Sequence, residues 1–474
     1  MSRSKLSAAA AALATVLLAI YYWRFTSVSL ATGFSQDDLM NLYFAWREPF
    51  GDVWKANFFF PTSVLRPFGA LFYRTTLHVW GYDPLPFRII CYILLWLNLP
   101  VAYLAARRLS GSREIALTAV LLHCVHGSYF PMYFGSGSCY DVFSFFFYGS
   151  ALALSLRART AGRLLSPLEC AALALLFACA VNSKEAAASL PAMLLVYELL
   201  YTRPRSISWI WREGRGVLVT GIVAILFLWS RFSGPNNLLG HPDYTPVFTI
   251  ARYLESTAHY LDELTAHANL WTTEFAAILL VTMALIAAAA RSRTLIFAWF
   301  LVAVGSAPMA FVTPRGLSSY YIPVLGYAIF LAVGLVRVRE FLVRSREPIG
   351  ILASQAILFA GLLAVLWQWQ DETERQFPDH WSELRHIESA ASQFRAHPEW
   401  FRPNSSLLIT NDPFGEWAWA STFIASVVGN DRSVSIRNLA KIEPRPTPAE
   451  IANYTTIIGY AGGRYYQMEP SAVR

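Results

Sequence analysis

Eleven apolar runs, each close to the length of a membrane-crossing helix, constrain the fold of this chain more than any other feature of its 474 residues. A helix needs about 20 mostly apolar residues to cross a bilayer. Here 55% of the residues are hydrophobic and only 15% are charged, whereas a soluble protein has about a quarter charged residues. The sequence therefore predicts a polytopic integral membrane protein. The runs lie near residues 7–23, 87–106, 114–132, 140–156, 167–181, 186–201, 216–232, 272–290, 294–311, 319–336 and 348–369.

The arginines between these runs alternate in a way that sets the orientation of the helices. If the N-terminus is cytoplasmic, every cytoplasmic connection holds at least two arginines, while the short connections on the other face hold only Lys184 and Arg315. Because positive residues favour the cytoplasmic side, we predict eleven spans and a non-cytoplasmic C-terminus. Aromatic residues 21–23 end the first run where a cleavage site would need small residues, so we expect that span to be retained. The cytoplasmic arginines are Arg107, Arg108, Arg113, Arg157, Arg159, Arg163, Arg203, Arg205, Arg212, Arg215, Arg291, Arg293, Arg337, Arg339, Arg344 and Arg346.

The segment 64–80 is a twelfth apolar stretch, but it contains Arg66, Arg74 and His78. Each arginine at mid-bilayer costs about 2.5–3.5 kcal/mol. Counting this segment as a span would also reverse the face of every later arginine cluster. We therefore predict an amphipathic helix that lies along the membrane surface.

The chain divides into a membrane domain, residues 1–370, with an outer loop at 24–86, and a small α/β domain, residues 371–474. In this second part, periodicity predicts two helices and apolar runs predict three strands. The fold class is thus an all-α polytopic membrane bundle of about eleven helices with a C-terminal α/β domain outside the cytoplasm. The predicted helices are 380–397 and 416–428, and the strand-like runs are 407–410, 434–436 and 455–460.

The charge and cysteine patterns exclude several kinds of function. The net charge of +7 comes from cations clustered between apolar runs, which is typical of orientation signals, so no nucleic-acid partner is predicted. No glycine-rich phosphate loop occurs, which argues against ATP as an energy source. The five cysteines form no C-x-x-C pair, and the sequence leaves open a bridge between Cys124 and Cys139.

Two adjacent carboxylates, Asp37 and Asp38, directly follow the first span on the outer face. An aspartate is ionised at neutral pH and can accept a proton, so either residue is a candidate general base. Taken alone, N-capping of a helix beginning near Leu39 explains the pair equally well.

Three lone cations are predicted on the same face: Lys184, Arg315 and Arg66. A lysine at a span end can extend to the interface beside a neutralising Glu185, or it can bind a lipid phosphate. Together the two carboxylates provide a proton acceptor and the three cations provide a phosphate-binding set, all at one membrane surface.

Further outward candidates are His126, His241 and Tyr321. The histidines lack the spacing of a metal motif, so no metal site is predicted. The sequence leaves open whether a divalent metal assists the chemistry.

The order of these segments resembles the polytopic glycosyltransferases of the C superfamily, especially the dolichyl-phosphate-mannose-dependent protein O-mannosyltransferases and their bacterial relatives. Over the first 340 residues the chain looks most like the transmembrane tetratricopeptide O-mannosyltransferases, although it lacks their C-terminal helical repeats. The matching segments, in order, are Asp37-Asp38, Arg66-Pro67, Gly81-Tyr82-Asp83-Pro84 with Arg88, the His126 segment, Asn182-Ser183-Lys184-Glu185, and Arg315 with Tyr320-Tyr321-Ile322-Pro323.

The resemblance implies a membrane glycosyltransferase, mannosyltransferase-like, that moves a sugar from a polyprenyl-phosphate carrier to a hydroxyl of a protein, lipid or glycan acceptor on the non-cytoplasmic face. It implies that Asp37 is the base, that Asp38 orients the acceptor or a metal, and that Lys184, Arg315 and Arg66 stabilise the lipid phosphate. The expected location is the bacterial plasma membrane, or the endoplasmic reticulum membrane in a eukaryote.

Two alternatives belong to other classes. A secondary transporter would place ionisable residues at the bilayer midplane and show repeated halves. A non-catalytic membrane scaffold would be insensitive to mutation of Asp37.

Overall fold

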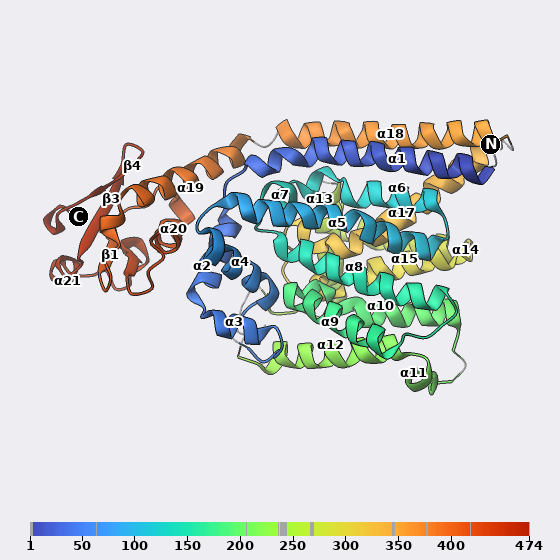
Figure 1. Cartoon of the computed structure of the whole chain (residues 1–474), viewed down its shortest axis with the longest axis horizontal. Coiled ribbons are helices and arrows are strands. Elements are labelled where there is room, and N and C mark those ends of the chain that lie inside the picture. The colour runs from blue at the N-terminus through green and yellow to red at the C-terminus, as the bar shows by residue number, and fades with distance from the viewer. Residues whose placement is uncertain are drawn as a thin grey trace.

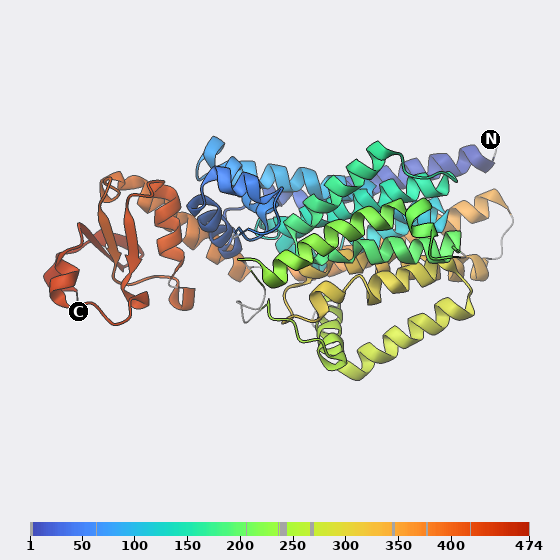
Figure 2. The ribbon, with the colours of Figure 1, turned by 90° about the horizontal axis from the view of Figure 1, so that it is seen from below.

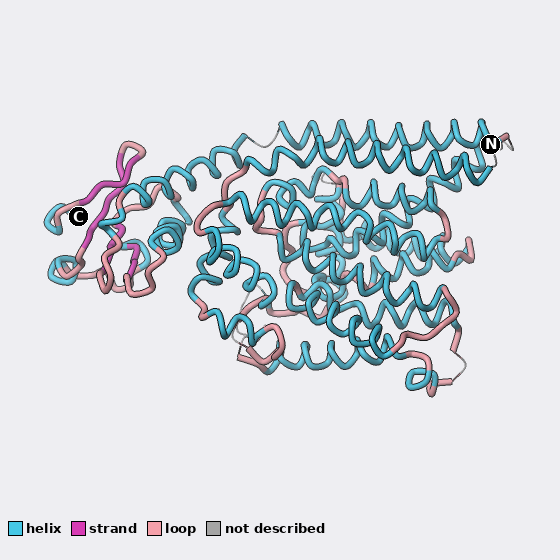
Figure 3. Tube along the Cα trace, viewed as in Figure 1, coloured by secondary structure: helices cyan, strands magenta, loops and turns pink. Residues whose placement is uncertain are grey.

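The computed structural model describes residues 3–62, 64–204, 206–235, 237, 244–265, 270–343, 347–375, 378–417 and 419–473. Its long helices run side by side in one bundle, and a small sheet with its own helices projects from one end, opposite the end where the N-terminus lies (Figures 1 and 3). The bundle helices are α1 (Arg3–Thr26), α5 (Pro84–Ser110), α6 (Arg113–Cys124), α8 (Cys139–Thr160), α9 (Pro167–Ser183), α10 (Leu190–Tyr197), α12 (Arg215–Ser233), α14 (Thr273–Ala289), α15 (Arg293–Ala303), α17 (Tyr321–Val343) and α18 (Pro348–Arg375).

Each of the eleven predicted apolar runs overlaps one of these helices, but the runs 114–132, 186–201 and 294–311 are each divided into shorter helical segments. Within the described residues, seven helical segments are long and apolar enough to cross a bilayer. The helices α6, α9, α10 and α14 are shorter, so the count of eleven spans stays a prediction. The seven segments are Ala8–Ala31, Pro84–Ser110, Cys139–Thr160, Arg215–Ser233, Arg293–Ala310, Leu317–Val343 and Pro348–Asp371.

Local sequence explains where several of these helices begin and end. Helix α9 begins with a capping box, in which Ser166 and Glu169 satisfy each other's backbone amides, and Pro167 occupies its first turn. Helix α5 begins after Asp83, whose side chain accepts from the amide of Leu85, and ends at Gly111, which has a φ of 71°. These caps fix the short connections on both faces of the bundle.

Three short helices cover the end of the bundle that faces the sheet (Figure 1). They are α2 (Gln36–Arg47), α3 (Phe50–Ala56) and α4 (Pro67–Trp80). Helix α4 has 14 residues, which is too short to cross a bilayer. This agrees with the prediction that segment 64–80 does not span, and its orientation along the surface stays a prediction.

The C-terminal part forms the expected helices and strands and two further elements, the short helix α21 and the strand β4. Helix α18 continues past the predicted boundary at 370 to Arg375. Strand β1 lies between β2 and β3, parallel to both, and β4, which the sequence did not predict, pairs antiparallel with β3. The elements are α19 (Pro378–Ala396), β1 (Ser406–Ile409), α20 (Ala420–Gly429), β2 (Ser435–Asn438), α21 (Pro448–Ala452), β3 (Thr456–Ala461) and β4 (Arg464–Gln467).

This C-terminal part projects beyond the bundle (Figure 2), and it contacts the outer loop through α20 and the loop that follows it. The ring of Phe423 stacks on Tyr43 with centroids 3.9 Å apart, and the indole N–H of Trp46 donates to Asn430 at 2.9 Å. Arg432 donates to the carbonyl of Glu48 at 3.0 Å. Helix α2 is thereby held between the bundle and the C-terminal part.

All five cysteines are free, so Cys124 and Cys139 form no bridge.

Candidate functional site

Asp38 is the third residue of α2 and completes a capping box with Ser35. One carboxylate oxygen accepts from the Ser35 amide at 2.9 Å and from the Ser35 hydroxyl at 2.8 Å. The other oxygen accepts from the hydroxyls of Tyr73 at 3.1 Å and Ser136 at 2.5 Å. Three hydrogen bonds and the Tyr73 hydroxyl, whose single proton is shared with the Ser136 carbonyl at 2.7 Å, thus surround this fully buried carboxylate. Its geometry is that of a group that holds the start of α2 in place.

Asp37, one residue earlier, has a different environment. Its side chain stays accessible, although protein surrounds most of it, and its Cβ lies against Gly137, where an added Cβ would come within 2.5 Å. Burial raises the pKa of the Asp37 carboxyl, and Asp38 raises it further, whereas Lys184 lowers it. An accessible carboxylate with a raised pKa is suited to accept a proton.

Lys184 lies in the turn after α9, where it caps the end of that helix. Its ammonium contacts both carboxylate oxygens of Asp141, at 2.7 and 2.8 Å, and donates to the hydroxyl of Ser319 at 3.2 Å. The lysine and aspartate side chains are only 8% and 5% exposed. The pair is therefore a buried ion pair that lies within electrostatic reach of Asp37.

A second group of charges is centred on Glu185. One of its oxygens accepts from Arg66 Nε at 3.1 Å, and the other lies 3.7 Å from a guanidinium nitrogen of Arg231. Burial raises the pKa of Glu185, but Arg66 and Arg231 outweigh burial, and with Lys184 they hold that pKa at about 2. The carboxylate is therefore ionised, and the two guanidinium groups share one negative charge.

Tyr244 connects the two predicted arginines. Arg66 donates to the Tyr244 hydroxyl at 3.3 Å, and the Arg315 guanidinium lies 4.0 Å from the centre of the same ring. Such cation–π contacts hold a guanidinium without neutralising it. The Nε of Arg315 is buried and has no hydrogen-bond partner within the described residues. The structure thus brings Arg66, Arg315 and, through Glu185, Lys184 to one region near Asp37.

Two predicted residues lie elsewhere. The Tyr321 hydroxyl contacts Cys124 Sγ at 3.9 Å, and its ring stacks on His123 in the bundle interior. His126 packs against Trp369, with ring centres 4.3 Å apart, and its Nδ1 accepts from the Ser128 amide. His241 lies outside the described residues. Within the described part of the chain, no three His, Cys, Asp or Glu side chains are grouped as metal ligands.

Three charged residues of this region were not singled out from the sequence: Asp141, Arg231 and Glu383. Asp141 and Arg231 lie inside predicted spans, and a charge in an apolar run is a signal that could have identified them. Glu383 comes from α19 of the C-terminal part. Its carboxylate accepts from the amide of Gln36, and burial and the nearby Asp37 raise its pKa. No local pattern distinguishes Glu383 from the other carboxylates of α19.

The fold and the site define a class: a polytopic membrane protein with buried charge pairs and an accessible carboxylate gathered at one end of its helix bundle. No protein-family model matches the sequence, and no curated protein matches it. Solved structures do match, and they show that the chain has the glycosyltransferase C fold.

One similar structure is ArnT from Cupriavidus metallidurans bound to undecaprenyl phosphate, with a TM-score of 0.53 and 14% sequence identity, covering 89% of this chain and 85% of that one. Another is the oligosaccharyltransferase of Archaeoglobus fulgidus tethered with an acceptor peptide containing the NVT sequon, with a TM-score of 0.51 and 11% identity. That alignment covers 90% of this chain and 63% of the oligosaccharyltransferase.

Proposed function

We propose that this protein is a membrane glycosyltransferase that moves a sugar from a polyprenyl-phosphate carrier to an acceptor hydroxyl on the non-cytoplasmic face. The observation that carries the proposal is the gathering of an accessible Asp37 and a set of buried cations at one end of the bundle. These groups come from segments far apart in the sequence, so the fold alone unites them.

The reaction is a displacement at the anomeric carbon of the donor sugar. The acceptor oxygen forms a bond to that carbon while the bond from the carbon to the phosphate oxygen breaks. The acceptor hydroxyl gives its proton to the Asp37 carboxylate, and the bonding electron pair leaves with the lipid phosphate. General-base assistance of this kind contributes about 10²–10⁴-fold in rate.

The cations act on the leaving phosphate. The donor phosphodiester carries one negative charge, and the phosphate monoester that leaves carries about −1.5 to −2 at neutral pH. Asp141 balances Lys184, and Glu185 balances one of the two guanidiniums beside it. The remaining guanidinium and Arg315 supply positive charge that matches the growing charge on the phosphate, which favours the transition state over the ground state.

The finer assignments belong to the same proposal. The donor sugar is a hexose of the mannose type, and the acceptor is a protein, lipid or glycan hydroxyl. Undecaprenyl phosphate bound to ArnT and the acceptor peptide tethered to the oligosaccharyltransferase support a lipid-linked donor and a large acceptor. The N-terminus and the C-terminal sheet lie at opposite ends of the bundle, which supports a site on the face opposite the N-terminus, and the arginine pattern favours a cytoplasmic N-terminus.

The test is transfer of labelled sugar from a polyprenyl-phosphate donor in membranes that contain Asp37→Asn. This variant keeps the shape of the side chain but cannot accept the proton, so transfer should fall by at least two orders of magnitude, while protein yield and donor binding stay unchanged. Asp52→Asn, the same change at an exposed position of α3, is the matched control. Full transfer by Asp37→Asn would refute the assignment of the base. The function would be refuted if the wild type used no polyprenyl-phosphate sugar and if a deletion strain contained the same amount of polyprenyl-phosphate sugar as its parent strain.

A further inference from the structure

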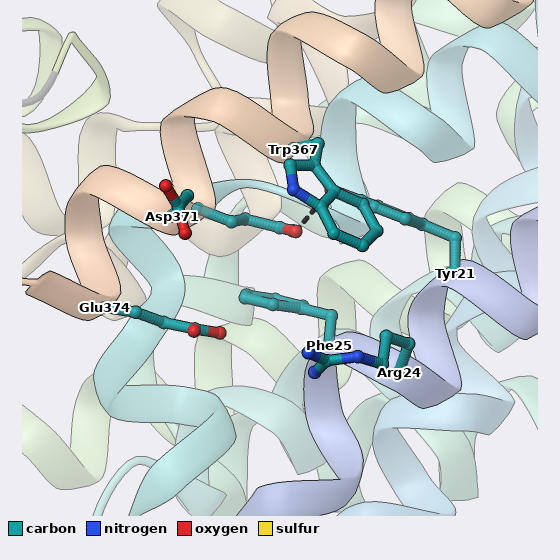
Figure 4. Close-up of a pocket in the computed structure, with 7 residues that line it drawn as sticks. Tyr21, Arg24, Phe25, Trp367, Asp371 and Glu374 are labelled. Atoms are coloured by element: carbon teal, nitrogen blue, oxygen red, sulfur yellow. Dashed lines mark hydrogen bonds between the residues drawn. The ribbon is translucent and has the colours of Figure 1, made fainter.

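A cavity of about 50 Å³ lies between α1 and α18, near the ends of both helices that lead toward the C-terminal sheet (Figures 1 and 4). None of its lining residues belongs to the site described above, and no step of the proposed reaction uses it. Its lining is Tyr21, Arg24, Phe25, Trp367, Gln370, Asp371 and Glu374.

The cavity carries charges of both signs. Arg24 comes from α1, whereas Asp371 and Glu374 come from α18, and in Figure 4 the carboxylate of Glu374 and the guanidinium of Arg24 flank the ring of Phe25. Asp371 pairs with Arg375 at 2.5 Å. Burial raises the pKa of Glu374, Asp371 raises it further and Arg24 lowers it. An added cation beside Glu374 would therefore be favourable.

Gln370 gives an independent indication of a ligand. Its side chain is only 5% exposed, and its amide oxygen accepts from the Tyr21 hydroxyl. Its amide nitrogen is buried and has no hydrogen-bond partner within the described residues. A buried donor without a partner is unfavourable, and this one belongs to a residue that lines the cavity, so a rotation of the amide toward an acceptor bound in the cavity would satisfy it.

The surroundings of the cavity are those of a membrane interface. Trp23 and Trp367 are about half exposed, at 54% and 50%, and both lie near the ends of long apolar helices whose outer faces are not covered by protein. Tryptophans concentrate at the level of the lipid headgroups. The molecules that meet this cavity are therefore phospholipid headgroups.

We propose that the cavity binds the headgroup of a phospholipid that carries a primary ammonium, the ethanolamine type. The phosphate oxygens accept from the Arg24 guanidinium and the Gln370 amide nitrogen, and the ammonium donates to Glu374 and Asp371. A primary ammonium has N–H groups that donate to carboxylates, whereas a trimethylammonium has no N–H group to donate. A headgroup without an amine would bring no cation to Glu374. This inference is independent of the proposed function.

The test uses the full-length protein, delipidated in detergent and titrated separately with phosphatidylethanolamine, phosphatidylcholine and phosphatidylglycerol, with bound lipid counted by native mass spectrometry. We expect the wild type to bind phosphatidylethanolamine most tightly. Arg24→Gln and Glu374→Gln should each weaken that binding about tenfold, the effect of losing one charged hydrogen bond, and Glu374→Gln should also remove the preference over phosphatidylglycerol. Arg47→Gln, the same change at an exposed residue of α2, should bind like the wild type.

Equal binding of phosphatidylcholine or phosphatidylglycerol by the wild type would overturn the proposal. So would unchanged phosphatidylethanolamine binding in Glu374→Gln. Because Glu374 is exposed at the end of α18, this variant should fold normally, and it keeps the test decisive even where Arg24→Gln is unstable.

Discussion

The buried pair of Lys184 and Asp141 makes a quantitative prediction about stability. Both side chains are at least nine-tenths buried and their charged atoms approach to 2.7 Å. Lys184→Met or Asp141→Asn alone leaves the partner charge buried and unpaired, which costs about 3–5 kcal/mol. The double variant leaves neither charge, so it should cost about as much as one single variant or less. The coupling free energy between the two positions is therefore expected to be about 3 kcal/mol or more.

The measurement is a double-mutant cycle on the free energy of unfolding. The four proteins are unfolded in mixed micelles with increasing amounts of a denaturing detergent, and the transition is followed by tryptophan fluorescence and by helical circular dichroism. Arg337 and Glu340 provide the control cycle, because they form a similar contact at 3.2 Å with side chains 75% and 48% exposed. An exposed pair should couple by no more than about 1 kcal/mol.

Additive effects at Lys184 and Asp141, with a coupling no larger than that of the control pair, would refute the reasoning. Such a result would mean that water or lipid headgroups solvate the ammonium in the membrane, and that the burial of the pair does not determine its energy.

Three further predictions concern activity and topology. A carboxylate base works deprotonated, so transfer should fall as the pH drops through the pKa of Asp37. Because burial and Asp38 raise that pKa above its ordinary 3.8, the acid limb of kcat/KM should lie above about pH 4. Lys184→Met removes a cation that lowers the pKa of Asp37, so in this variant the acid limb should move to higher pH. A limb that shifts downward in this variant would contradict the assignment. Gly137→Ala places a Cβ 2.5 Å from that of Asp37, so kcat should fall severalfold at normal protein yield, whereas Gly334→Ala, where a Cβ meets nothing within 4 Å, should be neutral. A reporter that works only in the cytoplasm should be silent when fused after Arg474, and an active fusion would refute the eleven-span topology.

The helices of the bundle could be predicted because their signal is local. An apolar run of membrane length has few structures open to it other than a helix, since lipid cannot satisfy free backbone groups. Strands β1 and β3 contain short apolar runs that are visible in the sequence, and β2 overlaps the predicted run 434–436 at Ser435 and Ile436. Strand β4 was missed because it reads Arg464, Tyr465, Tyr466, Gln467, and only Tyr465 is buried.

The pairing of charges could be predicted only in part. Lys184, Arg66 and Arg315 were recognisable as isolated cations on one face, and the structure does bring them together. Which carboxylate pairs with which cation was not predictable: Glu185, expected beside Lys184, pairs with Arg66. The Lys184–Asp141 contact joins residues 43 apart and depends on how α8 and α9 are rotated against each other. Helix rotation comes from the packing of whole helices and is not encoded in any short motif. For both aspartates the sequence offered helix N-capping as an alternative to a role as general base. The structure shows that Asp38 is the one in the capping box of α2.

Helix α2 connects the candidate site to the C-terminal part of the chain. Its first turn carries Asp37, and its last turns carry Tyr43 and Trp46, which rest on α20 and the loop after it. A helix of 12 residues is about 18 Å long and moves as a stiff rod, so a shift of 1 Å at the C-terminal part arrives at the carboxylate almost undiminished. Misplacement on that scale can change a rate about a hundredfold. Replacing or trimming the residues beyond 376 is therefore expected to alter the rate of transfer at the membrane surface. Exchanging this tail between related chains would also change the position of the Asp37 carboxylate.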